Sequence, residues 1–229
     1  MSFDNVVLRA AVWIVPLVIA IVFHEVAHGW TARALGDPTA YERRRLSLNP
    51  LRHVDPIGTV LLPLGLALAS LPPFGWAKPV PVDARRLREP RTGMMLVAIA
   101  GPASNILLAL VAAVTLGLTW RAAGGAAATG LGQLWLSGVT MFLLINVSLA
   151  LFNLLPVPPF DGGHIVQGLL PRPLAARWAA FGRYAIVFAI LLIVVLPWAV
   201  PQANVVAKVV APAVDHVSGW FFALADRLA

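Results

Sequence analysis

The amino-acid sequence predicts an all-α polytopic membrane protein, a bundle of about four to six membrane segments. Hydrophobic residues make up 59% of the 229 residues and charged residues only 12%, whereas a soluble domain averages roughly 25% charged. The mean hydropathy is correspondingly high, at +0.83. The basic residues gather in short loops between long apolar stretches, which is typical of the cytoplasmic loops of membrane proteins. We expect one integral-membrane domain over 1–229, with no separate soluble module.

Charge and cysteine content exclude several classes of function. The net charge is +7. Because the positive charges lie in loops between apolar spans, they indicate topology and contact with anionic lipid headgroups, and we expect no nucleic-acid partner. The sequence contains no cysteine, which excludes disulfides, thiolate nucleophiles and thiolate metal ligands. Histidine, aspartate and glutamate remain to bind any metal ion.

The first membrane helix is predicted at about 6–32, because residues 10–23 carry neither a charge nor a strongly polar side chain. These 14 residues cover about 21 Å of helix, against a hydrocarbon thickness of about 30 Å. A basic stretch follows at 33–56. Residues 57–71 are apolar but short and have basic residues on both sides. This favours a re-entrant segment with both flanks cytoplasmic over a tilted full span.

A short extended or β element is expected at 74–83. Pro79 and Pro81 push the residues before them towards β or polyproline II conformations. An extended edge beside a site in the membrane could pair with an extended segment of a partner.

Two further membrane helices are predicted at about 93–119 and 131–154. The second must end there, because prolines at 156, 158 and 159 cannot continue an α-helix. Broken backbone at this depth is typical of a functional site. A fourth span is expected at 180–200, followed by a tail at 204–228 that is either an interfacial helix or a weak last span. The chain thus divides into a core at about 6–170 and a C-terminal span and tail at about 171–229.

The most informative feature is the pentapeptide His24-Glu25-Val26-Ala27-His28 near the end of the first helix. Four residues advance a helix by about 400°, so His24 and His28 lie on one face, about 6 Å apart along the axis. Two imidazoles at this spacing can bind one tetrahedral Zn²⁺. Glu25 is rotated off the ligand direction, so it can act as a general base on a metal-bound water. Ionisable groups inside an apolar span are costly and indicate a functional site.

A catalytic zinc needs a third protein ligand, and Asp161 is the best candidate. It is the one acidic residue in the apolar core besides Glu25, and Gly162 and Gly163 let the backbone approach closely. The alternative is that Asp161 caps the helix that begins at this point, because aspartate is a favoured N-cap. Both roles can coexist.

Three motifs lie in order on separate predicted membrane segments: HEVAHGW at 24–30, GPASN at 101–105 and NLLPVPPFDGGH at 153–164. Together they resemble the site-2 protease family of intramembrane zinc metalloproteases. The stretches LSLNPLRHVDPIGT at 46–59 and FGWAKPVPV at 74–82 resemble the short bacterial members, without a PDZ or CBS domain. The resemblance covers about 24–164, which is most of the chain.

The resemblance implies a set of site residues. Zn²⁺, one ion per chain, would be bound by His24, His28 and Asp161, with Glu25 as the catalytic base. Asn153 would contact the substrate backbone or the developing oxyanion. Independently of the family, an asparagine amide in a dry pocket is a suitable preorganised donor. The FGWAKPVPV stretch would correspond to the family's re-entrant β-element.

Two further polar residues could contact this site. His164 lies one helical turn after Asp161 and could touch the ligands or the substrate. Asn105 lies on an apolar helix, where an interhelical hydrogen bond is common, and its GPASN setting also suits packing beside the site. His53, by contrast, lies in a polar stretch and is expected to form local hydrogen bonds.

We therefore expect an intramembrane zinc endopeptidase that hydrolyses peptide bonds within or near the transmembrane helices of single-span membrane proteins. Helix-weakening residues near the cut should help, because the peptide bond must be unwound before attack. The expected location is the inner, or cytoplasmic, cell membrane, with the active site nearer the cytoplasmic face. The sequence does not indicate an oligomeric state.

Two other classes remain open, a metal-binding membrane transporter and a non-proteolytic membrane scaffold of the same fold. Glu25 and the lack of an internal repeat favour the protease over the transporter. The complete set of His24, Glu25, His28 and Asp161 favours it over the scaffold.

Overall fold

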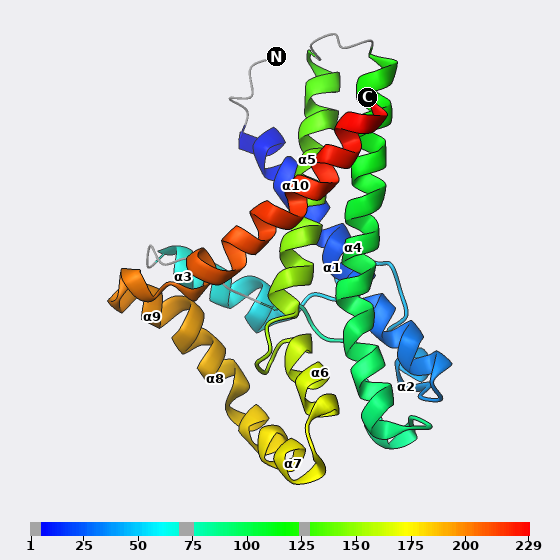
Figure 1. Ribbon diagram of the computed structural model, residues 1–229, viewed down its shortest axis with the longest axis vertical. Coiled ribbons are helices and arrows are strands. Elements are labelled where there is room, and N and C mark those ends of the chain that lie inside the picture. The colour runs from blue at the N-terminus through cyan, green and yellow to red at the C-terminus, as the bar shows by residue number, and fades with distance from the viewer. Residues whose placement is uncertain (1–5, 69–75, 124–128) are drawn as a thin grey trace.

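In the computed structural model, every regular element of the described residues, 6–68, 76–123 and 129–229, is a helix (Figure 1). Four of the helices in these ranges are long and apolar enough to cross a membrane. They are Ala11–Ala34, Pro90–Ala122, Leu131–Asn153 and Arg172–Ala199. The predicted all-α polytopic membrane class is confirmed.

The α-helices follow one another along the chain as α1 (Val6–Ala34), α2 (Thr39–Glu42), α3 (Leu62–Leu68), α4 (Pro90–Ala122), α5 (Leu131–Asn153), α6 (Asp161–Leu169), α7 (Arg172–Phe181), α8 (Ala185–Ile190), α9 (Leu196–Ala199) and α10 (Ala211–Leu228). Short 3₁₀ or π-helical turns lie at Pro50–Arg52, Pro56–Leu61, Ala84–Arg86, Gly182–Tyr184, Leu191–Val195, Pro201–Ala203 and Val206–Val210.

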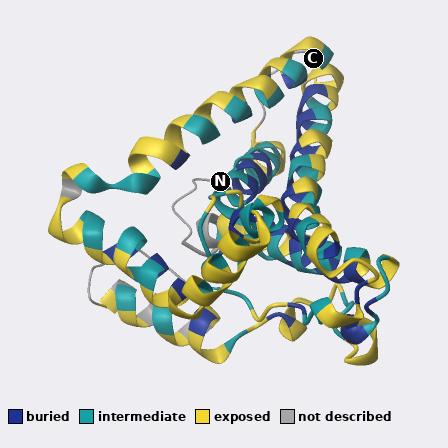
Figure 2. Ribbon diagram, turned by 60° about the horizontal axis from the view of Figure 1, so that its bottom comes forward, coloured by how far each residue is buried: buried dark blue, intermediate teal, exposed yellow. Residues whose placement is uncertain are grey.

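The bundle is built on α1, α4 and α5, which pack against one another. Buried residues gather where these helices meet, while exposed residues line their outer sides (Figure 2). On α1, the apolar side chains of Trp13, Ile14 and Val15 are each more than half exposed. Such side chains suit a helix surrounded by lipid, whose tails are as apolar as leucine.

Small residues let α4, α5 and α10 approach closely. The core between them contains Ala109, Ala112, Ala113, Leu116, Leu143, Val147 and Ala225. In membranes, small side chains at helix interfaces increase van der Waals contact between the backbones. At Gly117 of α4 the two backbones come close, because a methyl group there would lie 2.5 Å from the carbonyl oxygen of Ala225 on α10. The α10 helix therefore crosses α4 at a point that only glycine allows.

The segments between α1 and α4 differ from the predicted ones in detail. Residues 56–68 are helical, as a π turn followed by α3, and 69–71 lie outside the described residues, as do 74 and 75. Residues 76–83 form no strand. Pro79 and Pro81 have no N–H to donate to a ladder. The re-entrant path of 57–71 through the membrane stays a prediction.

The fourth span begins earlier than the predicted 180–200, because α7 already starts at Arg172. Its first turns carry Arg172 and Arg177, which lower the hydropathy on which the prediction relied. Prolines at 171 and 173 favour a helix start at this point. The tail forms α10, which packs on α4 and α5 and is not among the four candidate spans of the described chain.

We expect Gly117→Leu to loosen α10. The added side chain would push against the backbone of Ala225, and such overpacking typically costs about 1–3 kcal/mol. Thermal unfolding of the detergent-solubilised protein should occur at a lower temperature, and limited proteolysis should cut α10 first. Gly138→Leu on α5 is the matched control, because no atom lies within 4 Å of the site of its Cβ. Equal melting temperatures for the two variants would contradict this packing.

Candidate metal centre

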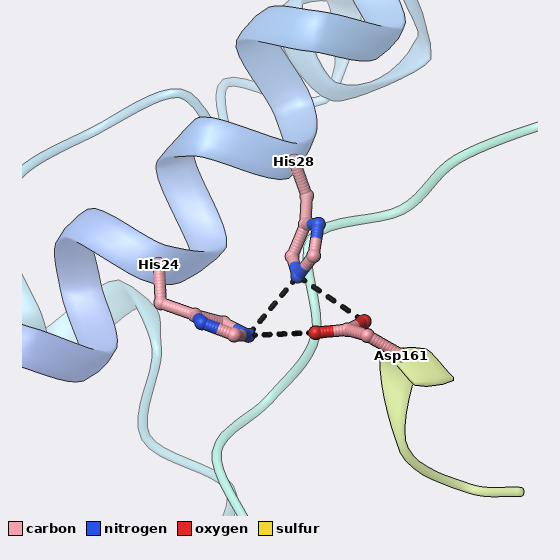
Figure 3. Close-up of side chains that lie close together, drawn as sticks. All are labelled: His24, His28 and Asp161. Carbon is pink, nitrogen blue, oxygen red and sulfur yellow. Dashed lines mark hydrogen bonds and ion pairs between the residues drawn. The ribbon is translucent and has the colours of Figure 1, made fainter. Parts of the chain in front are cut away.

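Three side chains from two distant segments converge on one point (Figure 3). His24 and His28 lie one turn apart on α1, and Asp161 is the first residue of α6. The two Nε2 atoms are 3.1 Å apart. His24 Nε2 lies 3.3 Å from Asp161 Oδ2, and His28 Nε2 lies 3.5 Å from Asp161 Oδ1. Within the described chain, these three residues form a group whose ligand atoms all lie within 4.8 Å of one another.

The opposite edges of both imidazoles are held by acceptors. His28 Nδ1 donates to the carbonyl oxygen of Val97 at 2.7 Å, and His24 Nδ1 lies 2.7 Å from Oδ1 of Asn105. Because a carbonyl oxygen only accepts, the ring proton of each histidine lies on Nδ1. In neutral rings, both Nε2 atoms then present lone pairs to each other and to a carboxylate.

This donor set fits a divalent cation. The two Nε2 atoms and the carboxylate of Asp161 face one another, and the buried Oδ2 of Asp161 has no hydrogen-bond partner. Two histidines and one carboxylate are a known ligand set of catalytic zinc, and outer hydrogen bonds such as those to Val97 and Asn105 fix the ligating tautomer.

Asp161 is brought to the histidines by a tightly packed turn. Phe160 occupies the N-cap position of α6, and Asp161 follows it inside the first turn, so the structure does not use this side chain as the helix cap. A side chain on Gly162 would collide with the carbonyl oxygens of Leu154 and Leu155, and one on Gly163 would lie 2.7 Å from the nitrogen of Pro158. The backbone at both glycines therefore lies close to the preceding turn, as predicted from the absence of a side chain.

Two side chains fix α6 from its neighbours. Arg91 of α4 donates from Nε to the carbonyl oxygen of Gly168 at 2.7 Å and from Nη2 to that of Leu170. Trp178 of α7 donates from Nε1 to the carbonyl oxygen of Gly163 at 2.9 Å. The helix that presents Asp161 is thus held near both of its ends.

Gly101, in the GPASN motif, packs directly against both imidazoles. A methyl group at this position would lie 2.5 Å from Nε2 of His28 and 2.6 Å from Cε1 of His24. No role was predicted for this glycine from the motif. Its signal was a Gly-Pro pair inside a predicted span, which suggests close backbone approach.

Glu25 lies beside the ligand group, and it lines one cavity together with His24, His28 and Asp161. Its Oε2 accepts a hydrogen bond of 2.8 Å from the backbone N–H of Val80. The side chain of Val80 is buried and rests on α1, where a methyl group at Gly29 would lie 2.8 Å from its Cγ1. The segment predicted to be extended therefore orients the carboxylate through its main chain.

Polar bonds outside the membrane spans tether that segment to the end of α1. The buried carboxylate of Asp37 accepts from the backbone N–H of Asp83 at 2.7 Å and of Thr39 at 3.0 Å. Arg86 donates to both carboxylate oxygens of Glu42, at 2.6 and 2.8 Å. The hydrogen bonds from Arg86 lower the pKa of the Glu42 carboxyl. Position 80 is thus held near Glu25 from its C-terminal side.

Asn153 and His164 line the same cavity of about 940 Å³. Asn153 Nδ2 donates to the carbonyl oxygen of Leu149 at 2.9 Å, which leaves its second amide hydrogen for another acceptor. His164 is exposed and lies outside the group of ligand atoms. His53 also lies outside it, with its Nε2 2.8 Å from the carbonyl oxygen of Ser47.

Asn105 is fully buried and lies against His24 rather than in the cavity. It also bonds to Asn146 of α5, a residue that the sequence analysis did not single out. The available signal was an amide in the middle of an otherwise apolar span.

The chain matches the family model described as peptidase family M50 over residues 122–194. It is 38% identical to YwhC of Bacillus subtilis over 185 residues, which are 79% of each chain. It is 32% identical to Rip2 of Mycolicibacterium smegmatis over 160 residues, which are 68% of this chain and 54% of Rip2. Both relatives carry the name "Putative zinc metalloprotease". No solved structure matches the chain.

We expect Gly101→Ala to weaken metal binding by about tenfold or more, the usual effect of disturbing what supports a ligand. The new methyl group would displace both imidazoles. Zinc affinity of the purified protein can be measured by competition with a chelating dye. Ala103→Val, on an exposed position of the same helix, is the control and should bind zinc as the wild type does. Unchanged affinity in Gly101→Ala would show that the rings do not rest on this glycine.

Proposed function

This chain belongs to peptidase family M50, the site-2 protease family, and we propose that it hydrolyses peptide bonds within or near the transmembrane helices of membrane-protein substrates. It is a multi-pass membrane metalloprotease by family and by its four apolar helices. The observation that carries the proposal is the convergence of His24, His28 and Asp161 beside Glu25 inside the helical bundle.

His24 and His28 would hold a zinc ion through Nε2, and Asp161 through its carboxylate. When bound, zinc would supply a Lewis acid that acidifies water and polarises the scissile carbonyl. Three protein ligands would leave a bound ion a further coordination position for water or substrate, as catalytic zinc sites require. We expect one zinc ion per chain.

Glu25 serves as the general base. The Val80 N–H holds Oε2, so Oε1 is the oxygen that takes a proton from the attacking water. The water oxygen bonds to the carbonyl carbon, and Glu25 returns the proton to the leaving amine nitrogen as the C–N bond breaks. The hydrogen bond from Val80 keeps the carboxylate from turning away between these two transfers.

Asn153 supports the proposed oxyanion contact. It lines the cavity together with Glu25 and Asp161, and one of its amide hydrogens is not needed by Leu149. A donor already in place costs no reorganisation when negative charge develops on the substrate oxygen. Its bond to the helix limits the positions that the side chain can take.

The cavity suits an apolar peptide segment. Its volume of about 940 Å³ is at the upper end of the range of roughly 300–1,000 Å³ for ligand pockets. Ile186, Ala189 and Ile193, from the C-terminal part of the chain, line the cavity together with the histidines. We propose single-span membrane proteins as substrates, with a locally unwound helix in the cavity. We propose that the protein lies in the inner membrane. The basic loops favour an orientation with this site nearer the cytoplasm.

Glu25→Gln should abolish cleavage while leaving zinc content and melting temperature near those of wild type. The amide cannot take a proton, and losing a general base lowers rates by about 10²–10⁴-fold. We would incubate the purified variants with single-span substrate helices that carry central glycine or proline. Glu89→Gln makes the same change on the exposed residue before α4 and should cut normally. Cleavage by Glu25→Gln at the wild-type rate would exclude this base.

The third ligand can be tested by comparing two neighbours on α6. Asp161→Ala should lose stoichiometric zinc and all cleavage, because two imidazoles alone hold the ion weakly. His164→Ala should retain zinc, because this side chain is not in the ligand group. Metal analysis of both purified variants decides the assignment. The reverse pattern would make His164 the ligand, and no zinc in carefully prepared wild type would remove the basis of the proposed peptidase.

A further inference from the structure

The buried amide of Asn146 is connected to the metal ligands by a continuous line of hydrogen bonds. Asn146 lies on α5 and Asn105 on α4, and neither has any exposed surface. Asn105 Nδ2 donates to Asn146 Oδ1 at 2.8 Å, and Asn105 Oδ1 lies 2.7 Å from His24 Nδ1. Three helices are therefore joined through three polar side chains, in a region where polar groups are otherwise avoided.

The direction of each bond is fixed by main-chain carbonyls, which only accept. Asn146 Nδ2 donates to the carbonyl oxygen of Phe142 at 2.8 Å, so its Oδ1 faces Asn105. Asn105 Nδ2 donates to that oxygen and, at 3.2 Å, to the carbonyl oxygen of Ala20, so its own Oδ1 faces His24. In the neutral ring, the proton of His24 must then lie on Nδ1, and Nε2 is left bare.

We propose that Asn146 is a positioning residue of the metal centre, which orients the amide of Asn105 and thereby holds His24 in its metal-binding tautomer. Without the acceptor on Asn146, Nδ2 of Asn105 keeps one acceptor, the carbonyl oxygen of Ala20 at 3.2 Å, and the bond to His24 can form with the amide in either orientation. A flipped amide would direct an N–H at Nδ1 of His24, and the ring would then carry its proton on Nε2, where the metal binds. The inference rests on the proposed zinc peptidase and adds a residue to its support.

The test compares Asn146→Leu with Asn146→Asp in the full-length protein. Leucine is close in size and has no acceptor, so the zinc dissociation constant should rise by about 10–100-fold, as when other supports of a ligating histidine are removed. Aspartate keeps an acceptor for Asn105, and as a neutral acid it also donates to Phe142, so its zinc affinity should stay close to wild type. Dye competition measures the affinity, and thermal unfolding is recorded alongside.

Leu143→Ala is the packing control. Leu143 is fully buried one turn before Asn146 on the same helix, and its side chain cannot hydrogen-bond to either amide. This variant should melt earlier yet bind zinc as tightly as wild type. Wild-type affinity in Asn146→Leu, or an equal loss of affinity in Leu143→Ala, would overturn the positioning role while leaving the proposed peptidase intact. Failure of the wild type itself to bind zinc would instead refute the peptidase.

A spectroscopic measurement decides the matter even if Asn146→Leu does not fold. In the wild-type protein labelled with ¹⁵N-histidine and studied before zinc is added, so that no metal fixes the tautomer, the His24 ring should show its proton on Nδ1, with slow exchange because the bond to Asn105 is buried. The signal is assigned by its loss in His24→Gln. A proton on Nε2 of His24, or rapid exchange of the Nδ1 proton, would overturn the inference.

Discussion

A hydrocarbon surrounding cannot hydrogen-bond, so every polar group inside the bundle has to find its partner within the protein. This constraint explains why the few polar side chains of the spans occur together. Nδ1 of His24 is hydrogen-bonded to Asn105, and Nδ1 of His28 donates to the carbonyl oxygen of Val97. The amide nitrogen of Asn105 donates to Asn146 and to the carbonyl oxygen of Ala20. Within the described parts of α1, α4, α5 and α6, Oδ2 of Asp161 is left without a hydrogen-bond partner, and it lies beside the two Nε2 atoms. A cation bound between these groups would offset the free-energy cost of burying them.

The histidines and Asp161 meet because backbones approach closely. Gly101 lets α4 contact both imidazoles, and Gly162 and Gly163 let α6 sit on the turn that precedes it. Arg91 and Trp178 then fix α6 in place. Aspartate is short, so the reach of its carboxylate depends on these contacts. The site geometry is thus distributed over several helices, and residues that never touch substrate control it.

Sequence reasoning predicted the elements whose signals are local. The apolar spans, the i, i+4 histidines and the break after α5 each follow from a short stretch of chain. The predicted extended or β element forms no strand in residues 76–83. The contact of this segment with Glu25 passes through the main chain of Val80. Main-chain contacts leave no residue signature. The hydrogen bond between Asn105 and Asn146 joins α4 to α5. It depends on how the two helices are rotated against each other, and this rotation could not be predicted from the sequence alone.

The contact that orients Glu25 determines which substitutions position 80 can tolerate. Because the donor at position 80 is a backbone N–H, any amino acid except proline can supply it. The side chain there is constrained mainly by the space over Gly29. Substitutions among small and medium residues can therefore accumulate at this position while the carboxylate keeps its partner. A reaction centre supported in this way is robust to mutation at a point where a side-chain donor would have to remain invariant.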